Sequence, residues 1–264
     1  MNPDKYTEER VLSLRSWTPQ LLSFHLSRPA GYQFTAGQFA RLGLVKTDAL
    51  APDDTGQRIV WRAYSIASAP EEGALEFCSV LLPEGEFTTE LARLQPGDTV
   101  LVERASYGFL TTAGFAPGKD LWMIATGTGL APFVSIIQER QNWQDFENLV
   151  IVHSVREAPE LAYRDTILKL AKEPPFGASG AKLRYVPIVT RDTLEGVLHE
   201  RIPVLAQDGR LEAAAGLALD LARSRILLCG NPAMVKDMRA LLGAAGYATS
   251  RRLKPGTLAV ENYW

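Results

Sequence analysis

The apolar pattern of the chain changes once, near residue 115, and this change limits the folds that the sequence can adopt. Before it, short segments rich in β-branched, aromatic or alternating apolar residues are separated by turn residues such as those at 36–37 and 96–98. Segments of this kind are typical of an antiparallel β-barrel or sandwich. The expected strands are 10–14, 21–27, 38–44, 59–67, 75–82 and 99–103. Phe87, Leu91 and Leu94 recur at helical spacing and predict one helix, at 87–94, among these strands.

After residue 114 the pattern changes to compact apolar runs that alternate with helical segments. The expected strands are 121–125, 149–153, 185–189 and 226–229, and the candidate helices are 132–143, 161–172 and 232–243. Strands that are apolar along their whole length are typical of parallel sheets covered on both faces. The sequence therefore predicts two domains, an N-terminal antiparallel β-barrel at 1–114 and a C-terminal doubly wound α/β domain with a parallel sheet at 115–264.

Charge and cysteine content narrow the classes of function. The formal net charge is −2, which gives no overall attraction to nucleic acid or to an anionic membrane. No segment reaches the roughly 20 apolar residues of a membrane span, and no apolar run near the N-terminus is typical of a signal peptide. Cys78 and Cys229 are too few for a four-thiolate metal centre. We therefore expect a cytoplasmic protein with no nucleic-acid, membrane or metal site, in which any redox centre is an organic cofactor.

Two glycine turns follow apolar strands in the second half. The strand at 121–125 runs into Gly127-Thr128-Gly129, and the last strand runs into Gly230-Asn231. Glycines in such turns let the backbone approach a phosphate, and the free N–H groups of a following helix attract its negative charge. An ordinary strand-to-helix connection has the same appearance. Because ligands collect at the carboxyl ends of strands in an open α/β sheet, two such turns together favour ligand binding.

Arginines follow the same strand ends. The strand at 149–153 is followed by Ser154 and Arg156, where an NAD site usually places a carboxylate on the ribose. Arg191 and Arg201 lie near the end of the next strand, and a guanidinium pairs well with a 2′-phosphate. Each arginine alone could be a solvated surface residue. Together they favour NADP over NAD.

The first half contains two further candidate sites. Arg62 and Ser65 lie in an apolar strand and need polar partners if they point inward, which a phosphate-bearing aromatic cofactor would supply. With Arg62 in solvent and Tyr64 in the core, the strand would need no ligand. At 83–89 a glycine and two threonines precede the helix, and this suits either a diphosphate or a plain helix cap.

Five motifs, in this order, resemble the ferredoxin–NADP(+) reductase family in its bacterial ferredoxin or flavodoxin reductase branch. They are the segments 62–65, 83–89, 127–132, 229–232 and 260–264, and the resemblance covers nearly the whole chain. It implies an N-terminal FAD-binding barrel and a C-terminal NADP-binding domain, whose C-terminal tail returns to the flavin.

The resemblance also implies which residues bind each cofactor. Those that match the FAD site are Arg62, Ala63, Tyr64, Ser65, Phe77, Ser79, Val80, Gly85, Glu86, Phe87, Thr88, Thr126, Tyr263 and Trp264. Those that match the NADP site are Thr126, Gly127, Thr128, Gly129, Pro132, Arg156, Arg191, Arg201, Gly230, Asn231 and Met234. Of the tail, Tyr263 would take the place of the terminal tyrosine that covers the flavin in plant-type members.

Three residues match positions with a role in the reaction. Ser65 would hydrogen-bond near the reactive flavin nitrogen, while Cys229 and Glu261 would flank the nicotinamide and a proton route. The resemblance implies direct hydride transfer between NADPH and FAD, followed by transfer of single electrons to ferredoxin or flavodoxin. We expect a monomeric oxidoreductase of this kind.

Two other functions fit the same fold. One is an NADPH:flavin reductase or the reductase component of a two-protein oxygenase. The other is a non-catalytic flavin-binding sensor module, against which the presence of Ser65, the glycine turns and the arginines argues. Reduction of a bound flavin by NADPH would separate the enzymes from the sensor.

Overall fold

The chain forms two compact units. The computed structural model describes residues 5–47, 57–177, 180–251 and 254–262. One unit is Met1–Gly108 and the other is Phe109–Trp264. The domain boundary expected from the sequence, 114/115, lies at the end of the short 3-10 turn η2 (Thr112–Gly114), shortly after this division.

The first unit is the expected antiparallel sheet. Its strands are β1 (Tyr6–Thr18), β2 (Leu21–Ser27), β3 (Phe39–Thr47), β4 (Gln57–Ser65), β5 (Ala74–Val80) and β6 (Thr99–Tyr107), in the order β4-β3-β6-β1-β2-β5. The two edge strands meet just after β4, because Ile66 bridges to Phe77 and the Ala67 N–H donates to the Glu76 carbonyl over 2.8 Å. The sheet thereby closes on itself, and the predicted barrel is confirmed.

The interior of the barrel is filled by large apolar side chains. Phe24, Leu42 and Phe77 are completely buried in one hydrophobic cluster. Helix α1 (Glu86–Leu91) contributes Phe87 and Leu91 to the same cluster. These two apolar residues are one helical turn apart, so they lie on the one face of the helix that is buried. Burying these side chains is the main stabilising term for a closed sheet of this size.

The second unit is built on a five-stranded parallel sheet. Its strands are β7 (Asp120–Thr126), β8 (Asn148–Val155), β9 (Lys182–Val189), β10 (Ser224–Gly230) and β11 (Leu258–Asn262), in the order β11-β10-β7-β8-β9. The chain therefore runs from β7 outward through β8 to β9, then crosses back to place β10 on the other side of β7. The strand order reverses between β7 and β10, and crevices for ligands form at such a switch point.

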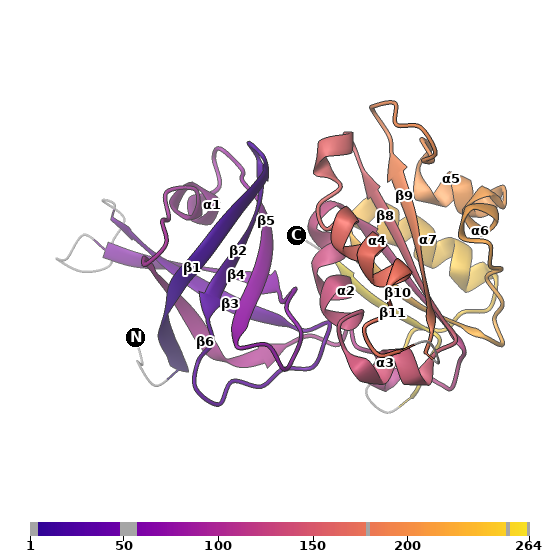
Figure 1. Ribbon diagram of the computed structural model, residues 1–264, viewed down its shortest axis with the longest axis horizontal. Helices are drawn as coiled ribbons and strands as arrows, with labels where there is room; N and C mark the ends of the chain where they lie inside the picture. The colour runs from indigo at the N-terminus through magenta and orange to yellow at the C-terminus, as the bar shows by residue number, and fades with distance from the viewer. Residues whose placement is uncertain (1–4, 48–56, 178–179, 252–253, 263–264) are drawn as a thin grey trace. The chain divides into compact units, whose positions relative to one another are not determined.

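Helices cover both faces of this sheet, as its uniformly apolar strands predict. They are α2 (Ala131–Ile136), α3 (Arg140–Asp145), α4 (Arg164–Lys172), α5 (Ile202–Gln207), α6 (Arg210–Ala215) and α7 (Pro232–Ala244). Residues of α5, α6 and α7 share one hydrophobic cluster with the sheet, and in Figure 1 α4 lies in front of the sheet and α7 behind it. Within the described part of the chain, no helix is long and apolar enough to cross a membrane.

The single helix expected at 132–143 is two helices. The carbonyls at the end of α2 bond to side chains instead of continuing the helical ladder: Asn142 Nδ2 donates to the Ile136 carbonyl over 2.9 Å, and Trp143 Nε1 donates to the Ile137 carbonyl over 2.7 Å. Both side chains are buried, so the break is stabilised by contacts that the helical periodicity does not reveal.

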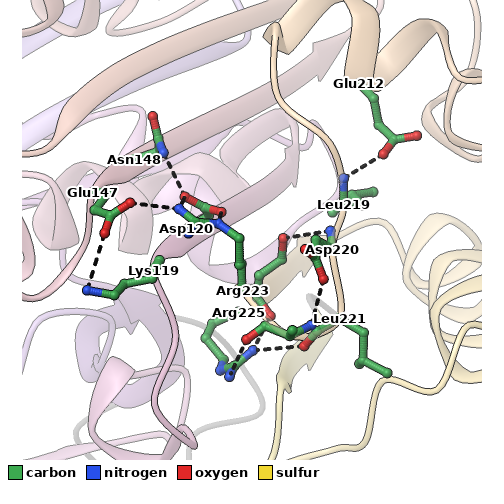
Figure 2. Close-up of polar contacts among 12 residues, drawn as sticks. Lys119, Asp120, Glu147, Asn148, Glu212, Leu219, Asp220, Leu221, Arg223 and Arg225 are labelled. Carbon is green, nitrogen blue, oxygen red and sulfur yellow. Dashed lines mark hydrogen bonds and ion pairs between the residues drawn. The ribbon is translucent and has the colours of Figure 1, made fainter.

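An ion-pair network ties together the amino-terminal ends of the central strands (Figure 2). The carboxylate of Asp120, completely buried at the start of β7, accepts from Arg223 Nε over 3.0 Å and from Asn148 Nδ2 over 2.6 Å. Arg223 also donates to Glu147, which pairs with Lys119. These two carboxylates, Asp120 first, raise the pKa of Arg223. The network lies at the opposite end of the strands from the glycine turns.

Candidate functional site

The two glycine turns of the second unit lie in direct backbone contact at the carboxyl ends of β7 and β10. A Cβ atom added to Gly129 would lie 2.7 Å from the Cys229 carbonyl oxygen, and one added to Gly230 would lie 2.7 Å from the Thr126 carbonyl oxygen. Neither distance is tolerable for a side chain, so both positions require glycine for close approach. Gly127 has open space around its Cα and needs glycine for its φ of +54°.

Polar bonds fix these turns relative to each other. The Thr126 hydroxyl accepts from the Asn231 N–H over 2.7 Å, so it joins the end of β7 to the turn after β10. The Asn231 side chain in turn caps α7, accepting from the N–H groups of Ala233 and Met234. The turn Gly127–Leu130 (η3) and the helix α2 that follows it, with Pro132 in its first turn, have no side-chain cap. Among the described residues, no side chain caps the N–H groups of this first turn, which leaves them available to an anion.

The three arginines follow the next two strands of the sheet. Arg156 directly follows β8 and Arg191 is the second residue after β9, and the Arg191 N–H donates to the Arg156 carbonyl over 2.8 Å. Arg201 is two residues after His199, and the Nδ1 of His199 lies 3.0 Å from the carbonyl oxygen of Val189 at the end of β9. All three arginines are exposed, and none has an ion pair with another described residue. They provide cationic groups near the carboxyl end of the sheet.

Cys229 and Glu261 are register partners on the neighbouring strands β10 and β11. Cys229 is completely buried, and burial, followed by the nearby charge of Glu261, raises the pKa of its thiol well above the ordinary value. Burial also raises the pKa of Glu261 to about 7. A carboxyl group with this pKa can hold or release a proton at neutral pH.

In the first unit, Ser65 and Arg62 occupy the last residues of β4. The Ser65 side chain is 3% exposed, and its hydroxyl has no hydrogen-bond partner among the described residues. Arg62 is exposed, and its guanidinium lies 3.8 Å from the Glu86 carboxylate. Ala63, which follows Arg62, is exposed as well. An unpartnered buried hydroxyl and an accessible guanidinium on the same strand fit a ligand that supplies both an acceptor and a phosphate.

Tyr64 connects β4 to the other elements of the candidate flavin site. Its hydroxyl lies 3.0 Å from Ser79 Oγ on β5, and its ring packs against Phe87 of α1, with ring centroids 5.2 Å apart. Burial raises the pKa of Tyr64. Phe77 is fully inside the core, so only its main chain is available to a ligand, whereas Val80 at the end of β5 is partly exposed.

The turn at Gly85 is held by its own threonines. Thr88 Oγ1 donates to the Leu82 carbonyl over 2.8 Å and Thr89 Oγ1 donates to the Gly85 carbonyl over 2.8 Å. Glu86, in the first turn of α1, pairs with Arg58, which lowers the pKa of its carboxyl. Neither threonine caps the helix through a bond to its N–H groups, so the first turn of α1 is also without a side-chain cap.

Two expected site residues, Tyr263 and Trp264, lie outside the described residues. One residue that the sequence did not single out is His153, which is buried in β8 and contacts the Gly127 carbonyl. A histidine near the end of an otherwise apolar strand is the signal that could have found it. Among the described residues, no group of three or more histidine, cysteine, aspartate or glutamate side chains could hold a metal ion.

Comparisons with known proteins cover both units. Residues 123–240 match the family model described as the oxidoreductase NAD-binding domain. The chain is 40% identical to ferredoxin–NADP reductase A of Sorangium cellulosum over 259 residues, which are 97% of this chain and 89% of that protein. It is 38% identical to the flavodoxin/ferredoxin–NADP reductase of Escherichia coli over 256 residues, 97% of each.

A solved structure is similar over nearly the whole chain. It is that of a ferredoxin NADP+ reductase from Neisseria gonorrhoeae with bound FAD and NADP. The TM-score is 0.88 at 37% sequence identity, and the alignment covers 98% of this chain and 99% of the other.

Proposed function

Because the chain belongs to the ferredoxin–NADP reductase family, we propose that it is a flavoenzyme that transfers a hydride between NADPH and FAD and single electrons between FAD and ferredoxin or flavodoxin. The observation that carries the nucleotide part of this function is the backbone contact between the two glycine turns at the switch point of the parallel sheet. The names of the relatives favour this function over a free-flavin reductase, an oxygenase component or a sensor module.

The first unit supplies groups that fit FAD. The unpartnered hydroxyl of Ser65 is available to a flavin acceptor, and Arg62 with the uncapped first turn of α1 is available to the diphosphate. Ser79 and Thr88 have their hydroxyls bonded within the unit, so they shape the site and leave binding to the backbone around them. When bound, FAD accepts a hydride and releases its electrons one at a time, which connects a nicotinamide to a one-electron carrier.

The second unit supplies groups that fit NADP(H). The N–H groups of the turn at Gly127, Thr128 and Gly129 face a diphosphate in this proposal, and the turn at Gly230, Asn231 and Met234 forms the adjacent wall. Arg156, Arg191 and Arg201 bind the 2′-phosphate, which an NAD molecule lacks. The selectivity for NADPH then comes from arginines that follow β8 and β9, away from the reacting ring.

The residues around the nicotinamide control protons and not electrons. Cys229 stays a thiol because burial raises its pKa, so it is an uncharged, largely apolar group. Glu261, with a pKa of about 7, is the group proposed to exchange a proton with solvent as the flavin changes redox state.

The decisive experiment is anaerobic stopped-flow absorbance of the purified flavoprotein. NADPH should bleach the flavin rapidly and NADH should do so much more slowly, and oxidised ferredoxin or flavodoxin should restore the colour. A flavin that NADPH does not reduce would contradict the function. Recovery with free flavin but with neither carrier would indicate the flavin-reductase alternative.

Cellular location and oligomeric state are part of the proposal. We propose that the protein is a cytoplasmic monomer that exchanges electrons with its carrier in a transient complex. Light scattering of the purified holoenzyme should give the mass of one chain. A stable dimer would contradict this part without affecting the chemistry.

A further inference from the structure

His153 contacts the first glycine turn from inside the second unit. It lies in β8, between Ala125 of β7 and Pro187 of β9 in the sheet register. Its side chain is 1% exposed, its Nε2 lies 3.1 Å from the Gly127 carbonyl oxygen and its Nδ1 lies 3.4 Å from the Tyr185 hydroxyl. The imidazole thus connects the Gly127 turn, after β7, to Tyr185 on β9.

The two neighbours determine which ring nitrogen carries the proton. The Gly127 carbonyl can only accept, so Nε2 of His153 carries the hydrogen and donates it. Burial lowers the pKa of His153 to about 4, so the ring is neutral and Nδ1 is an acceptor. The Tyr185 hydroxyl can donate to that nitrogen, and burial raises the pKa of Tyr185, which keeps the hydroxyl protonated.

The bond to His153 orients the peptide group between Gly127 and Thr128. In a planar trans peptide the C=O and the following N–H point in opposite directions, and the described chain has no cis peptide. Because the Gly127 carbonyl points toward the buried imidazole, the Thr128 N–H points away from it, to the other side of the turn. Gly127, at φ +54°, has no Cβ atom to restrict its ψ angle, so a bond to its carbonyl can select the orientation of this peptide group.

The other contacts of the turn do not replace this bond. Gly129 packs against the backbone of Cys229, and the Thr126 hydroxyl binds Asn231, so both of these contacts hold the turn against β10. Neither involves the peptide group that follows Gly127, which among the described residues otherwise takes part only in the backbone bonding of the 3-10 turn Gly127–Leu130. His153 is the side chain that acts on this group from β8.

We propose that His153 is a positioning residue for NADP(H), which holds the Gly127 carbonyl inward so that the Thr128 N–H is presented to the diphosphate. This inference rests on the proposed function and adds a residue to it. His153 does not contact the nucleotide in this proposal. It holds the Gly127–Thr128 peptide in one orientation before the nucleotide binds. NADP(H) then binds more tightly, because its binding does not have to select that orientation.

The test compares two ligands on the holoenzyme and its variants. NADP+ carries both the diphosphate and the 2′-phosphate, whereas adenosine 2′-monophosphate carries only the latter. His153→Phe, or His153→Leu as a smaller substitute, should weaken NADP+ about fivefold to tenfold, the effect of one net hydrogen bond. Binding of adenosine 2′-monophosphate, measured by calorimetry, should be unchanged because its phosphate is held by the arginines.

Three further variants separate positioning from folding. His153→Gln keeps an N–H donor and should restore most of the NADP+ affinity, and Tyr185→Phe should give a smaller loss than His153→Phe. Ile151→Val shortens a completely buried residue on the same face of β8 and should leave both affinities unchanged. In steady-state assays with ferricyanide, His153→Phe should raise KM for NADPH and change kcat by less than about twofold.

Two outcomes would contradict the inference. Equal losses for both ligands would mean that His153 only maintains the fold, and unchanged NADP+ binding by His153→Phe would mean that the peptide is oriented without it. If the unaltered holoenzyme bound neither ligand, both the proposed function and this inference would fail. If the unaltered holoenzyme bound both ligands and only the variants differed from these expectations, the inference alone would fail.

Discussion

The hydroxyls of Ser65 and Ser68 are close together on the chain and almost equally buried, but they differ in their partners. Ser68 Oγ accepts from the Glu76 N–H over 3.1 Å, whereas Ser65 Oγ has no partner among the described residues. Leaving a buried hydroxyl unbonded costs on the order of 1–3 kcal/mol. A ligand that supplies the missing bond would account for this hydroxyl, and on this ground we propose Ser65 as a flavin-binding residue.

Ser65→Ala should therefore affect the reaction more than the fold. We expect hydride transfer from NADPH to slow by about tenfold to a hundredfold, because a bond available to the reacting flavin is lost. Stability of the FAD-free protein should be unchanged or higher, since the variant removes an unpaired polar group. Stopped-flow rates and thermal unfolding measure the two effects. Ser68→Ala is the control, with a normal rate and lower stability, and a Ser65→Ala variant with normal hydride transfer would contradict the assignment.

The arginines after β8 and β9 are the residues that we propose determine coenzyme choice. Arg156→Ala combined with Arg191→Ala should lower kcat/KM for NADPH by about a hundredfold or more, because charge-assisted bonds to the 2′-phosphate are lost. The same double variant should change kcat/KM for NADH little. Arg210→Ala removes an exposed arginine of the same unit that pairs with Asp208, and it should leave both values unchanged. Equal losses for NADPH and NADH would show that the pair does not bind the 2′-phosphate.

Glu261 makes stability depend on pH in a direction unusual for a carboxyl group. Its pKa is raised from 4.5 to about 7 by burial, so between these values the folded state holds a proton that the unfolded state has released. The free energy of unfolding therefore falls as pH rises from about 4.5 to about 7, by up to about 3 kcal/mol, and is then constant. Glu261→Gln should remove this fall. Urea unfolding at several pH values tests it, and parallel profiles for the two proteins would contradict it.

At the scale of elements, the parallel sheet separates stability from chemistry. The carboxyl ends of β7 and β10 carry the glycine turns, while the amino ends carry the ion-pair network around Asp120 (Figure 2). In a parallel sheet all carboxyl ends of the strands lie at one edge and all amino ends at the other. One edge can therefore bind a ligand while the other carries stabilising contacts. Variation at the amino ends is then expected to change stability without changing nucleotide binding.

Asp120→Asn tests this separation. The change removes a completely buried charge whose partner Arg223 is partly exposed, and we expect a loss of about 2 kcal/mol, below the value for a fully buried pair. The affinity of the folded protein for NADP+ should remain normal. Chemical unfolding and calorimetry at a temperature where the variant is folded measure the two quantities. A large loss of NADP+ affinity with little loss of stability would contradict the separation.

At the scale of the whole molecule, each unit is proposed to bind its own cofactor. Most residues proposed for FAD belong to unit Met1–Gly108, and those proposed for NADP belong to unit Phe109–Trp264, which also includes Thr126, Tyr263 and Trp264 of the FAD set. Each unit has its own hydrophobic core. A ligand that binds only the folded state stabilises it, by about 2.7 kcal/mol at a concentration a hundred times its dissociation constant. The two cofactors should therefore act on different parts of the chain.

Hydrogen exchange can detect this division. Removing FAD should accelerate amide exchange mainly within 57–91 of the first unit, and adding NADP+ should slow exchange mainly around 126–132 and 230–234 of the second. Exchange followed by peptide mapping resolves these segments. The FAD-free protein without nucleotide is the reference for both. Protection of the barrel strands by NADP+ alone would contradict the assignment of cofactors to units.

The sequence by itself determined the two kinds of fold and where the glycine turns lie. Alternating short strands, then fully apolar strands with helices between them, are local patterns, and local patterns decide which segments become strands or helices. They did not predict β11 as the fifth strand of the sheet, because a short C-terminal strand gains its stability from β10 and not from its own sequence. Nor did they show the break between α2 and α3, which depends on buried side chains.

Only the tertiary structure decided which of the candidate residues meet. The bond from Asn231 to Thr126 spans 105 positions of the chain, and the bond from His153 to Gly127 joins different strands. Both depend on the strand order β11-β10-β7-β8-β9, which sequence periodicity does not contain. The same is true of the unpartnered hydroxyl of Ser65, because whether a buried group finds a partner depends on every element packed around it.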